Sequence, residues 1–266
     1  MTKTVLVGAG AMGEAILAGL LKSGRPADSL VVVEKRAERA AELVAAHGVT
    51  VSDDLGVVAG AEQVLLAVKP QDIFAVLDEI APSLAAGQTV ISIAAGVTIA
   101  SIEARVPAGV AVVRVMPNTP ALVSEGISAL SGGLAATGAQ VAAAEELMSA
   151  CGTVVVVPEK QMDAVTAVSG SGPAYVFYVI DAMVEAGVHL GLPRPTAHQL
   201  AVQTVLGSAV MARDTGTHPA VLREQVTSPA GTTAAALRQL DERGVRAAFL
   251  AALEACRDRS AELAGS

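Results

Sequence analysis

Aromatic and basic residues are scarce in this chain of 266 residues. It has no tryptophan, three phenylalanines and two tyrosines, so it offers no series of rings on which single-stranded bases could stack. Lysine and arginine number 18 against 26 aspartates and glutamates, and the formal net charge of −8 opposes non-specific attraction to nucleic acid or an anionic membrane. We therefore expect no nucleic-acid partner and no membrane partner.

Cysteine is also rare. Cys151 and Cys256 are too few and too far apart for a disulfide framework or a zinc site. The start of the chain runs from Thr2 and Lys3 directly into a strand, without the apolar region of an export signal. We expect a cytoplasmic protein with reduced thiols. We also expect no metal site and no catalytic histidine, because no ligand-pair spacing occurs among His47, His189, His198 and His218.

Hydrophobic residues make up 52% of the chain and charged residues 17%, which favours a packed protein over a disordered one. Residues 80–102 carry no charge, which is long enough to test for a membrane span. Pro82, Gly87 and Gly96 interrupt this segment, and the β-branched run at 90–93 is typical of a buried strand between loops. We predict no transmembrane helix.

The first 160 residues alternate short aliphatic runs with longer helical windows. Strands are predicted at 4–7, 30–34, 63–68, 89–93, 111–116 and 153–157, and helices at 13–21, 37–46 and 140–150. Continuous apolar strands that alternate with helices indicate a parallel sheet covered on both faces. The predicted fold class is α/β, with a doubly wound, mostly parallel sheet.

The pattern changes after Pro158. Only helices are predicted from there on, at 172–190, 194–214, 218–227, 232–242 and 244–262. We therefore expect two domains, at residues 1–160 and 161–266. The helix at 172–190 is apolar nearly all round, which a small helical domain cannot cover by itself, so we expect a partner subunit.

A glycine turn follows the first predicted strand and consists of Gly8, Ala9, Gly10, Ala11, Met12 and Gly13. A GxGxxG pattern is weak evidence alone, but here it follows a strand and opens a helix, which is the context of a dinucleotide site. Gly8 permits the tight turn, Gly10 leaves room for the pyrophosphate, and Gly13 lets the helix pack closely on the strand. Amides at the start of the helix would then hold the phosphates.

The second predicted strand ends at Glu34, which follows Gly13 by 34 − 13 = 21 residues. This is close to the spacing of the acid that accepts hydrogen bonds from the adenosine ribose, and it favours NAD. Lys35 and Arg36 come next, and a basic pair at this place suits the 2′-phosphate of NADP. The choice between NADH and NADPH therefore stays open, and a plain surface role for the basic pair is equally acceptable.

Three further loops follow the carboxyl ends of predicted strands, where ligands collect in open α/β sheets. They supply candidate cofactor contacts at Ala67, Val68, Lys69 and Pro70 and at Ala94, Ala95 and Gly96, and a candidate substrate contact at Asn118. The plain alternatives are that Pro70 starts a helix, that Lys69 is a solvated cap and that Asn118 lies in an ordinary turn. Residues 169–173 are expected to form a tight turn at the start of a helix.

A second hydroxyl-rich segment, residues 228–233, precedes the helix predicted at 232–242. Ser228, Gly231, Thr232 and Thr233 could form an ordinary helix cap. The same amides and hydroxyls would also suit the carboxylate of a small substrate. From the residues alone, both interpretations remain open.

These motifs together carry a family resemblance that extends over essentially the whole chain. In the glycine turn and in residues 67–70, 114–118, 163–175 and 228–233, the sequence resembles the pyrroline-5-carboxylate reductases, the last enzymes of proline biosynthesis. The resemblance implies a Rossmann domain, a helical dimerisation domain and dimers often assembled into larger rings. It further implies that Ser228, Gly231, Thr232 and Thr233 hold the substrate carboxylate across the dimer, with the Thr233 hydroxyl near the ring nitrogen as the catalytic contact.

Two positions depart from the family pattern. Ala230 stands where a glycine is usual, and it would be strained by roughly 1 to 2 kcal/mol if its backbone had a positive φ. Glu34 is unexpected in a family that tends towards NADPH.

The activity that the resemblance implies is NAD(P)H-dependent reduction of L-1-pyrroline-5-carboxylate to L-proline. The alternatives are another small-substrate reductase, of the hydroxyacid or ketopantoate type, and a non-enzymatic NAD(P)H sensor.

Overall fold

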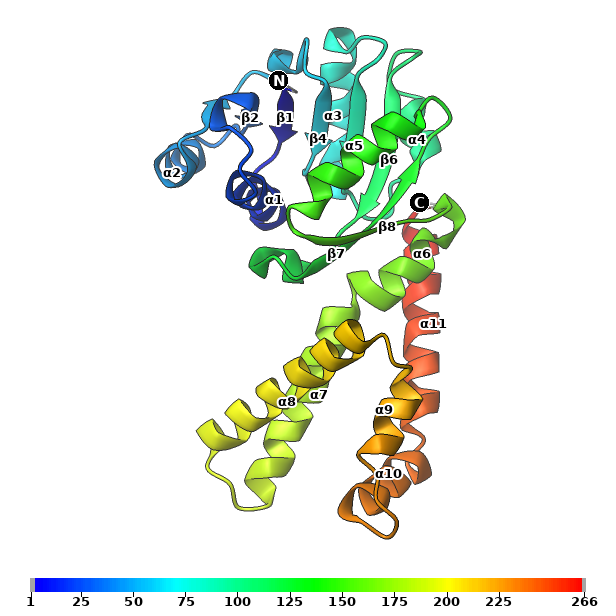
Figure 1. Ribbon diagram of the computed structural model, residues 1–266. Coiled ribbons are helices and arrows are strands. Elements are labelled where there is room, and N and C mark those ends of the chain that lie inside the picture. The colour runs from blue at the N-terminus through cyan, green and yellow to red at the C-terminus, as the bar shows by residue number, and fades with distance from the viewer. Residues whose placement is uncertain (1–2, 265–266) are drawn as a thin grey trace. The chain divides into compact units, whose positions relative to one another are not determined.

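The computed structural model describes residues 3–264 and divides into two compact units (Figure 1). The first unit contains the chain through Ser171 together with the segment from Cys256 onward, and the second contains Gly172–Ala255. The division lies beyond residue 160 because Met162 and Ala167 are buried and Ser260 donates a 2.7 Å hydrogen bond to Asp163. The last helix thus returns to the first unit at its end.

One sheet of eight strands forms the centre of the first unit, in the order β3-β2-β1-β4-β5-β6-β7-β8. The strands are β1 Thr4–Val7, β2 Leu30–Val33, β3 Thr50–Ser52, β4 Gln63–Leu66, β5 Thr89–Ser92, β6 Ala111–Met116, β7 Gly126–Gly132 and β8 Gly152–Val156. Neighbouring strands are parallel except for β6 and β7, which are antiparallel. The predicted doubly wound, mostly parallel sheet is confirmed.

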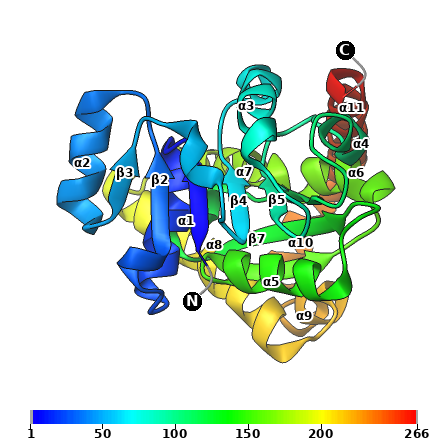
Figure 2. The same cartoon turned by 90° about the horizontal axis from the view of Figure 1, so that it is seen from above.

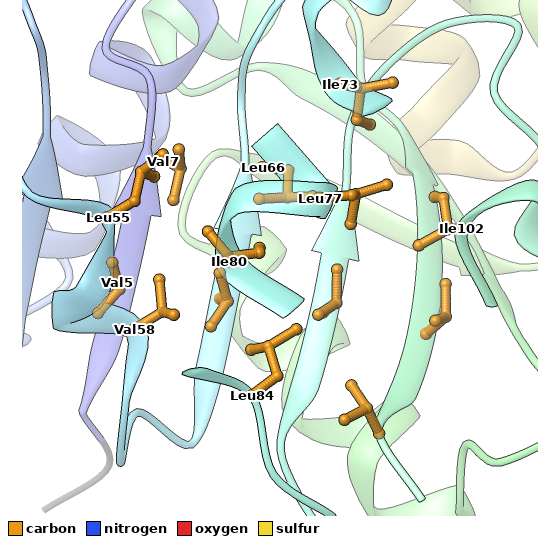
Figure 3. Close-up of a cluster of buried hydrophobic side chains, with 14 of the residues drawn as sticks. Val5, Val7, Leu55, Val58, Leu66, Ile73, Leu77, Ile80, Leu84 and Ile102 are labelled. Atoms are coloured by element: carbon orange, nitrogen blue, oxygen red, sulfur yellow. The ribbon is translucent and has the colours of Figure 1, made fainter. Parts of the chain in front are cut away.

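Both faces of this sheet are buried, which explains why its strands are continuous apolar runs. Successive side chains point to opposite faces, so Val5 and Val7 join one core cluster and Leu6 joins the other. Helices α3 (Ile73–Ile80) and α4 (Ile99–Glu103) cover the first face, where the β-strand side chains meet Leu77 and Ile80 (Figure 3).

Three other helices cover the second face: α1 Ala11–Lys22, α2 Ala37–His47 and α5 Gly138–Ser149. Seen from above, α3 and α5 lie on opposite sides of the sheet (Figure 2). Parallel strands with helices on both faces bring their carboxyl ends to one edge, and the candidate cofactor loops follow those ends.

Two strands were missed by the sequence analysis. Strand β3 has only three residues, none of them fully buried, so it lacks the apolar signal of the others. Strand β7 begins and ends with glycine and contains two serines, which weakens its pattern. It follows β6 after a 3₁₀ turn at Thr119–Val123, and a connection without a crossover helix leaves only the antiparallel direction.

The five helices predicted at the end of the chain are all present: α7 Gly172–His189, α8 Arg194–Thr215, α9 Pro219–Gln225, α10 Thr232–Glu242 and α11 Val245–Ala264. The short helix α6 (Met162–Val165) precedes them in the first unit. No helix within residues 3–264 is long and apolar enough to cross a membrane.

The helical unit has a very small core of its own. Val184, Ala197 and Ala201 are its buried apolar side chains, at the packing of α7 on α8. In contrast, Phe177 and Tyr178 on α7 are 64% and 78% exposed in the single chain. Such a surface needs cover from another subunit, as the sequence analysis expected.

Candidate active site

The glycine turn joins β1 to α1 and is shaped by two close approaches of the backbone. Gly8 has φ +89, and a Cβ there would lie 3.0 Å from the Ala67 carbonyl oxygen. A Cβ on Gly13 would lie 2.5 Å from the Gly8 carbonyl oxygen and 3.1 Å from Ala67 Cβ. No side chain fits at either position, so both glycines hold α1 and the loop after β4 against the end of β1.

Gly10 differs from these two glycines. Its φ is −68, and a Cβ built on it would meet nothing within 4 Å. Gly10 is therefore not needed for packing, and the space above it is open. As the N-cap of α1 it supplies no side-chain hydrogen bond, so the first-turn amides are left for an anion.

Glu34 follows the end of β2 and has partners within the protein. Its carboxylate accepts hydrogen bonds from the Arg36 amide at 3.0 Å, from Arg36 Nε at 3.1 Å and from Arg36 Nη2 at 3.3 Å. Burial raises the pKa of Glu34, but the bonds from Arg36 and the Ala9 amide outweigh it, and the net pKa is lowered. The Glu34 side chain is 9% exposed and the Arg36 side chain 70%, so the guanidinium that pairs with Glu34 lies at the surface.

Lys35 lies in an exposed ion pair with Glu79 at 3.2 Å. The loops after β4 and β5 lie beside the glycine turn along the same sheet edge, since β1, β4 and β5 are neighbours. Pro70 begins a 3₁₀ turn with the exposed Lys69 as its N-cap. Gly96 has φ +74, and a Cβ there would lie 3.6 Å from Leu263. The predicted cofactor residues are thus gathered at one edge.

Asn118 uses both ends of its amide to hold backbone. Its Oδ1 accepts from the Ile127 amide at 2.9 Å, and its Nδ2 donates to the Ser169 carbonyl at 3.2 Å. The second contact falls in a π-helical turn at Thr166–Gly170, which leads through Ser171 into α7. The prediction of a tight turn at residues 169–173 was wrong, because the chain there runs from the π-helical turn, which is wider than an α-helical turn, into α7.

The α2 helix adds two residues that the sequence analysis did not predict. Arg39 and His47 both contact Glu14 in the first turn of α1, His47 through Nε2 at 3.1 Å. The Arg39 hydrogen bond lowers the pKa of Glu14, burial opposes this, and His47 adds a further lowering. No local pattern marks these contacts, since the partners lie 25 and 33 positions apart.

Residues 228–233 form a turn at the start of α10. The Gly231 amide donates to the Ser228 carbonyl at 3.0 Å, and Ala230 has φ +56, as at the third residue of a type II turn. A Cβ on Gly231 would collide with Ser228 Oγ. Gly231 is the N-cap of α10 and provides no side-chain cap, so the amides of Thr232 and Thr233 open the helix uncapped.

The sheet order, the uncapped glycine turn and the acidic residue after β2 define a Rossmann-type dinucleotide-binding protein. Residues 159–263 match the family described as pyrroline-5-carboxylate reductase dimerisation, and residues 3–96 match that described as NADP oxidoreductase, coenzyme F420-dependent. The chain is 45% identical to the pyrroline-5-carboxylate reductase of Corynebacterium melassecola, over 99% of both chains. The chain therefore belongs to the pyrroline-5-carboxylate reductase family.

Other relatives agree with this assignment. The pyrroline-5-carboxylate reductase of Mycobacterium tuberculosis is 43% identical, over 99% of this chain and 97% of the relative. The solved structure from Coxiella burnetii has a TM-score of 0.95 at 37% identity and covers 98% of both chains. The Plasmodium falciparum structure, with NADP bound, has a TM-score of 0.87 at 28% identity and covers 99% of this chain and 98% of that one. The helical unit is accordingly the family's dimerisation domain.

Gly10 and Gly13 should respond differently to the same substitution. Gly10→Ala adds a methyl group to open space, so we expect a nearly unchanged urea midpoint but a loss of NADPH affinity of about tenfold or more. Gly13→Ala forces α1 away from β1, so we expect a loss of about 1 to 3 kcal/mol of unfolding free energy. Urea unfolding and fluorescence titration with NADPH test the pair, and equal destabilisation by both would contradict this interpretation.

Ala230 is in the left-handed region, which costs a non-glycine residue roughly 1 to 2 kcal/mol. Replacing alanine with glycine relieves this strain but costs about 0.5 to 1 kcal/mol of unfolding free energy, because the unfolded chain gains conformational freedom. We therefore expect Ala230→Gly to stabilise the protein by up to about 1 kcal/mol in thermal unfolding. Ala236→Gly, inside α10, is the matched control and should destabilise by about 1 kcal/mol. A loss of stability in both variants would contradict the strain argument.

Proposed function

We propose that this protein reduces L-1-pyrroline-5-carboxylate to L-proline with hydride from NAD(P)H, in the cytoplasm, as the last step of proline biosynthesis. The observation that carries the proposal is family membership over the whole chain, with 99% of both chains aligned at 45% identity. The glycine turn at the sheet edge and the uncapped start of α10 provide the two kinds of binding group that the reaction needs.

The proposed cofactor site uses the amides at the start of α1 for the pyrophosphate, above the open space at Gly10. Ala67–Pro70 and Ala94–Gly96 would line the nicotinamide side of the same edge. When bound, the nicotinamide supplies the hydride. Because protein donors already occupy the Glu34 carboxylate and Arg36 is held outward, we propose that Arg36 and Lys35 meet the 2′-phosphate and that NADPH is preferred over NADH.

The proposed substrate site lies at the start of α10. The amides of Thr232 and Thr233, with the Ser228 hydroxyl, would bind the substrate carboxylate. The Gly231 amide is already donated to the Ser228 carbonyl, so Gly231 would contribute by closing the turn without a side chain. The Thr233 hydroxyl would meet the ring nitrogen while it changes from imine to amine. Asn118 stays a proposed substrate contact, since an asparagine amide has a second Nδ2 hydrogen beyond the one given to Ser169.

The proposed reaction requires this chain mainly to position the substrate against the cofactor. A cyclic imine can take its proton from solvent, so a histidine acid is not required. Holding the imine carbon against the hydride donor converts an encounter into an oriented unimolecular step, which is a large contribution to rate. We further propose that the α10 turn acts across the dimer and that dimers assemble into a larger ring, supported by the exposed apolar face of α7.

A steady-state assay tests the reaction directly. We expect oxidation of NADPH with L-1-pyrroline-5-carboxylate, none with 2-keto acids, and no reduction of NADP+ with 3-hydroxy acids. The reason is that the α10 turn binds a carboxylate, but no catalytic histidine is present to exchange a proton with a carbonyl or alcohol oxygen. Parallel assays with NADH should give the higher KM for cofactor. Turnover of the keto acids would support another reductase class, and NADPH binding without any turnover would support a sensor.

Thr233→Ala removes the hydroxyl proposed to meet the ring nitrogen. We expect kcat to fall roughly 10- to 100-fold, as for a lost hydrogen bond to a charged group, with the Kd for NADPH unchanged. Thr233→Ser keeps the hydroxyl and is the matched control, and it should retain most of the activity. Equal kcat in the wild type and the alanine variant would remove Thr233 from the mechanism.

A further inference from the structure

Arg39 lies on α2 and connects this helix to the glycine turn and to α1. Its Nε donates to the Ala9 carbonyl at 3.2 Å, its Nη2 contacts Glu14, and its Nη1 lies 2.9 Å from Glu42. The side chain is 21% exposed, against 70% for Arg36. The Arg39 side chain is therefore half-buried against the glycine turn, and its N–H groups bond to protein acceptors on Ala9, Glu14 and Glu42.

Ala9 is fully buried, and side chains that follow β2 lie at both of its backbone polar groups. Its carbonyl accepts from Arg39 Nε at 3.2 Å, and its amide lies near enough to the Glu34 carboxylate to contribute to the lowered pKa of Glu34. The peptide bond from Ala9 to Gly10 is trans, so its C=O and N–H point in opposite directions. With the carbonyl drawn toward Arg39, the Gly10 N–H is directed to the opposite side of the turn.

We propose that Arg39 is a positioning residue that sets the orientation of the Ala9–Gly10 peptide, and through it the Gly10 amide that meets the cofactor pyrophosphate. The proposal rests on the proposed function, in which the glycine turn binds NAD(P)H. A Cβ built on Gly10 would meet nothing within 4 Å, so side-chain packing does not fix the orientation of this peptide, and the contact of Gly10 within α1 is made by its own carbonyl, which accepts from the Glu14 amide at 2.9 Å. The guanidinium fork suits the task, because one planar group reaches Ala9, Glu14 and Glu42 together.

A second effect of Arg39 is electrostatic. Glu14 lies in the first turn of α1, where a carboxylate repels a bound pyrophosphate. Arg39 and His47 both pair with Glu14, and His47 is partly buried beside it. A test of positioning must therefore distinguish two effects of Arg39: its effect on the orientation of the Ala9–Gly10 peptide, and its neutralisation of the Glu14 charge.

The test compares Arg39→Met, which keeps the aliphatic stem, with Arg39→Lys and with the control Arg105→Met. Arg105 also pairs with a carboxylate, Asp78 at 2.9 Å, but on the far face of the sheet beside Phe74. Three probes are titrated: NADPH, ADP-ribose and adenosine 2′-monophosphate. The first two contain the pyrophosphate and the third does not.

We expect Arg39→Met to raise the Kd for NADPH and for ADP-ribose about tenfold and to leave the Kd for adenosine 2′-monophosphate unchanged. The kcat at saturating NADPH should stay within about twofold of wild type, because the amide acts on binding of the pyrophosphate. Arg39→Lys should be intermediate, since one ammonium cannot serve Ala9 and Glu14 in the fork geometry. Arg105→Met should bind all three probes as the wild type does.

Five results would overturn the proposal. Equal weakening of all three probes would indicate a general loosening of the unit. Weakening of NADPH and adenosine 2′-monophosphate, with ADP-ribose unchanged, would indicate a direct contact of Arg39 with the 2′-phosphate. Unchanged affinity for NADPH would show that the Gly10 amide does not depend on Arg39. Full recovery in Arg39→Met with Glu14→Gln would assign the effect to charge alone. A wild type that binds neither NADPH nor ADP-ribose would overturn the proposed function itself.

Discussion

The approach of Gly13 to the Gly8 carbonyl is the contact on which the rest of the cofactor site depends. At 2.5 Å from a Cβ position to that oxygen, no residue other than glycine allows α1 to start so close to β1. The same position lies 3.1 Å from Ala67 Cβ, so the loop after β4 is held by the contact as well. The N-cap of this helix is Gly10, which has no side chain, so the first amides of α1 are without a side-chain cap at the end that this contact holds against β1.

The charges around this edge are arranged so that an anion can bind in an acidic protein. Glu14 and Glu34 both lie beside the glycine turn, and hydrogen bonds from arginines lower the pKa of each. Both carboxylates are thus ionised at neutral pH, and each is compensated by its own guanidinium, Arg39 or Arg36. The net charge of −8 is therefore not representative of this edge, where the outward group is Arg36.

The helical unit differs from the sheet unit in how little apolar surface it buries within a single chain. Its own core consists of small contacts between α7 and α8, while aromatic and aliphatic side chains of α7 stay exposed in the single chain. Association with a second chain would bury this apolar surface and stabilise the unit, which agrees with its match to a dimerisation family. The strained turn at Ala230 belongs to this unit, and the proposed substrate contacts lie on both sides of it, at Ser228 and at the start of α10.

Sequence alone predicted six of the strands, the five terminal helices and the glycine turn, and it identified Ala230 as a position of conditional backbone strain. Each of these depends on local periodicity or on the backbone conformations that one residue allows. Tertiary structure decided the reversal at β7, the use of Asn118 to hold the π-helical turn, and the partners of Glu34 and Arg39. Except for the local pairs Glu34–Arg36 and Arg39–Glu42 and the consecutive strands β6 and β7, these contacts depend on groups far apart in the chain. Only packing of the sheet and its helices brings such groups within hydrogen-bond distance.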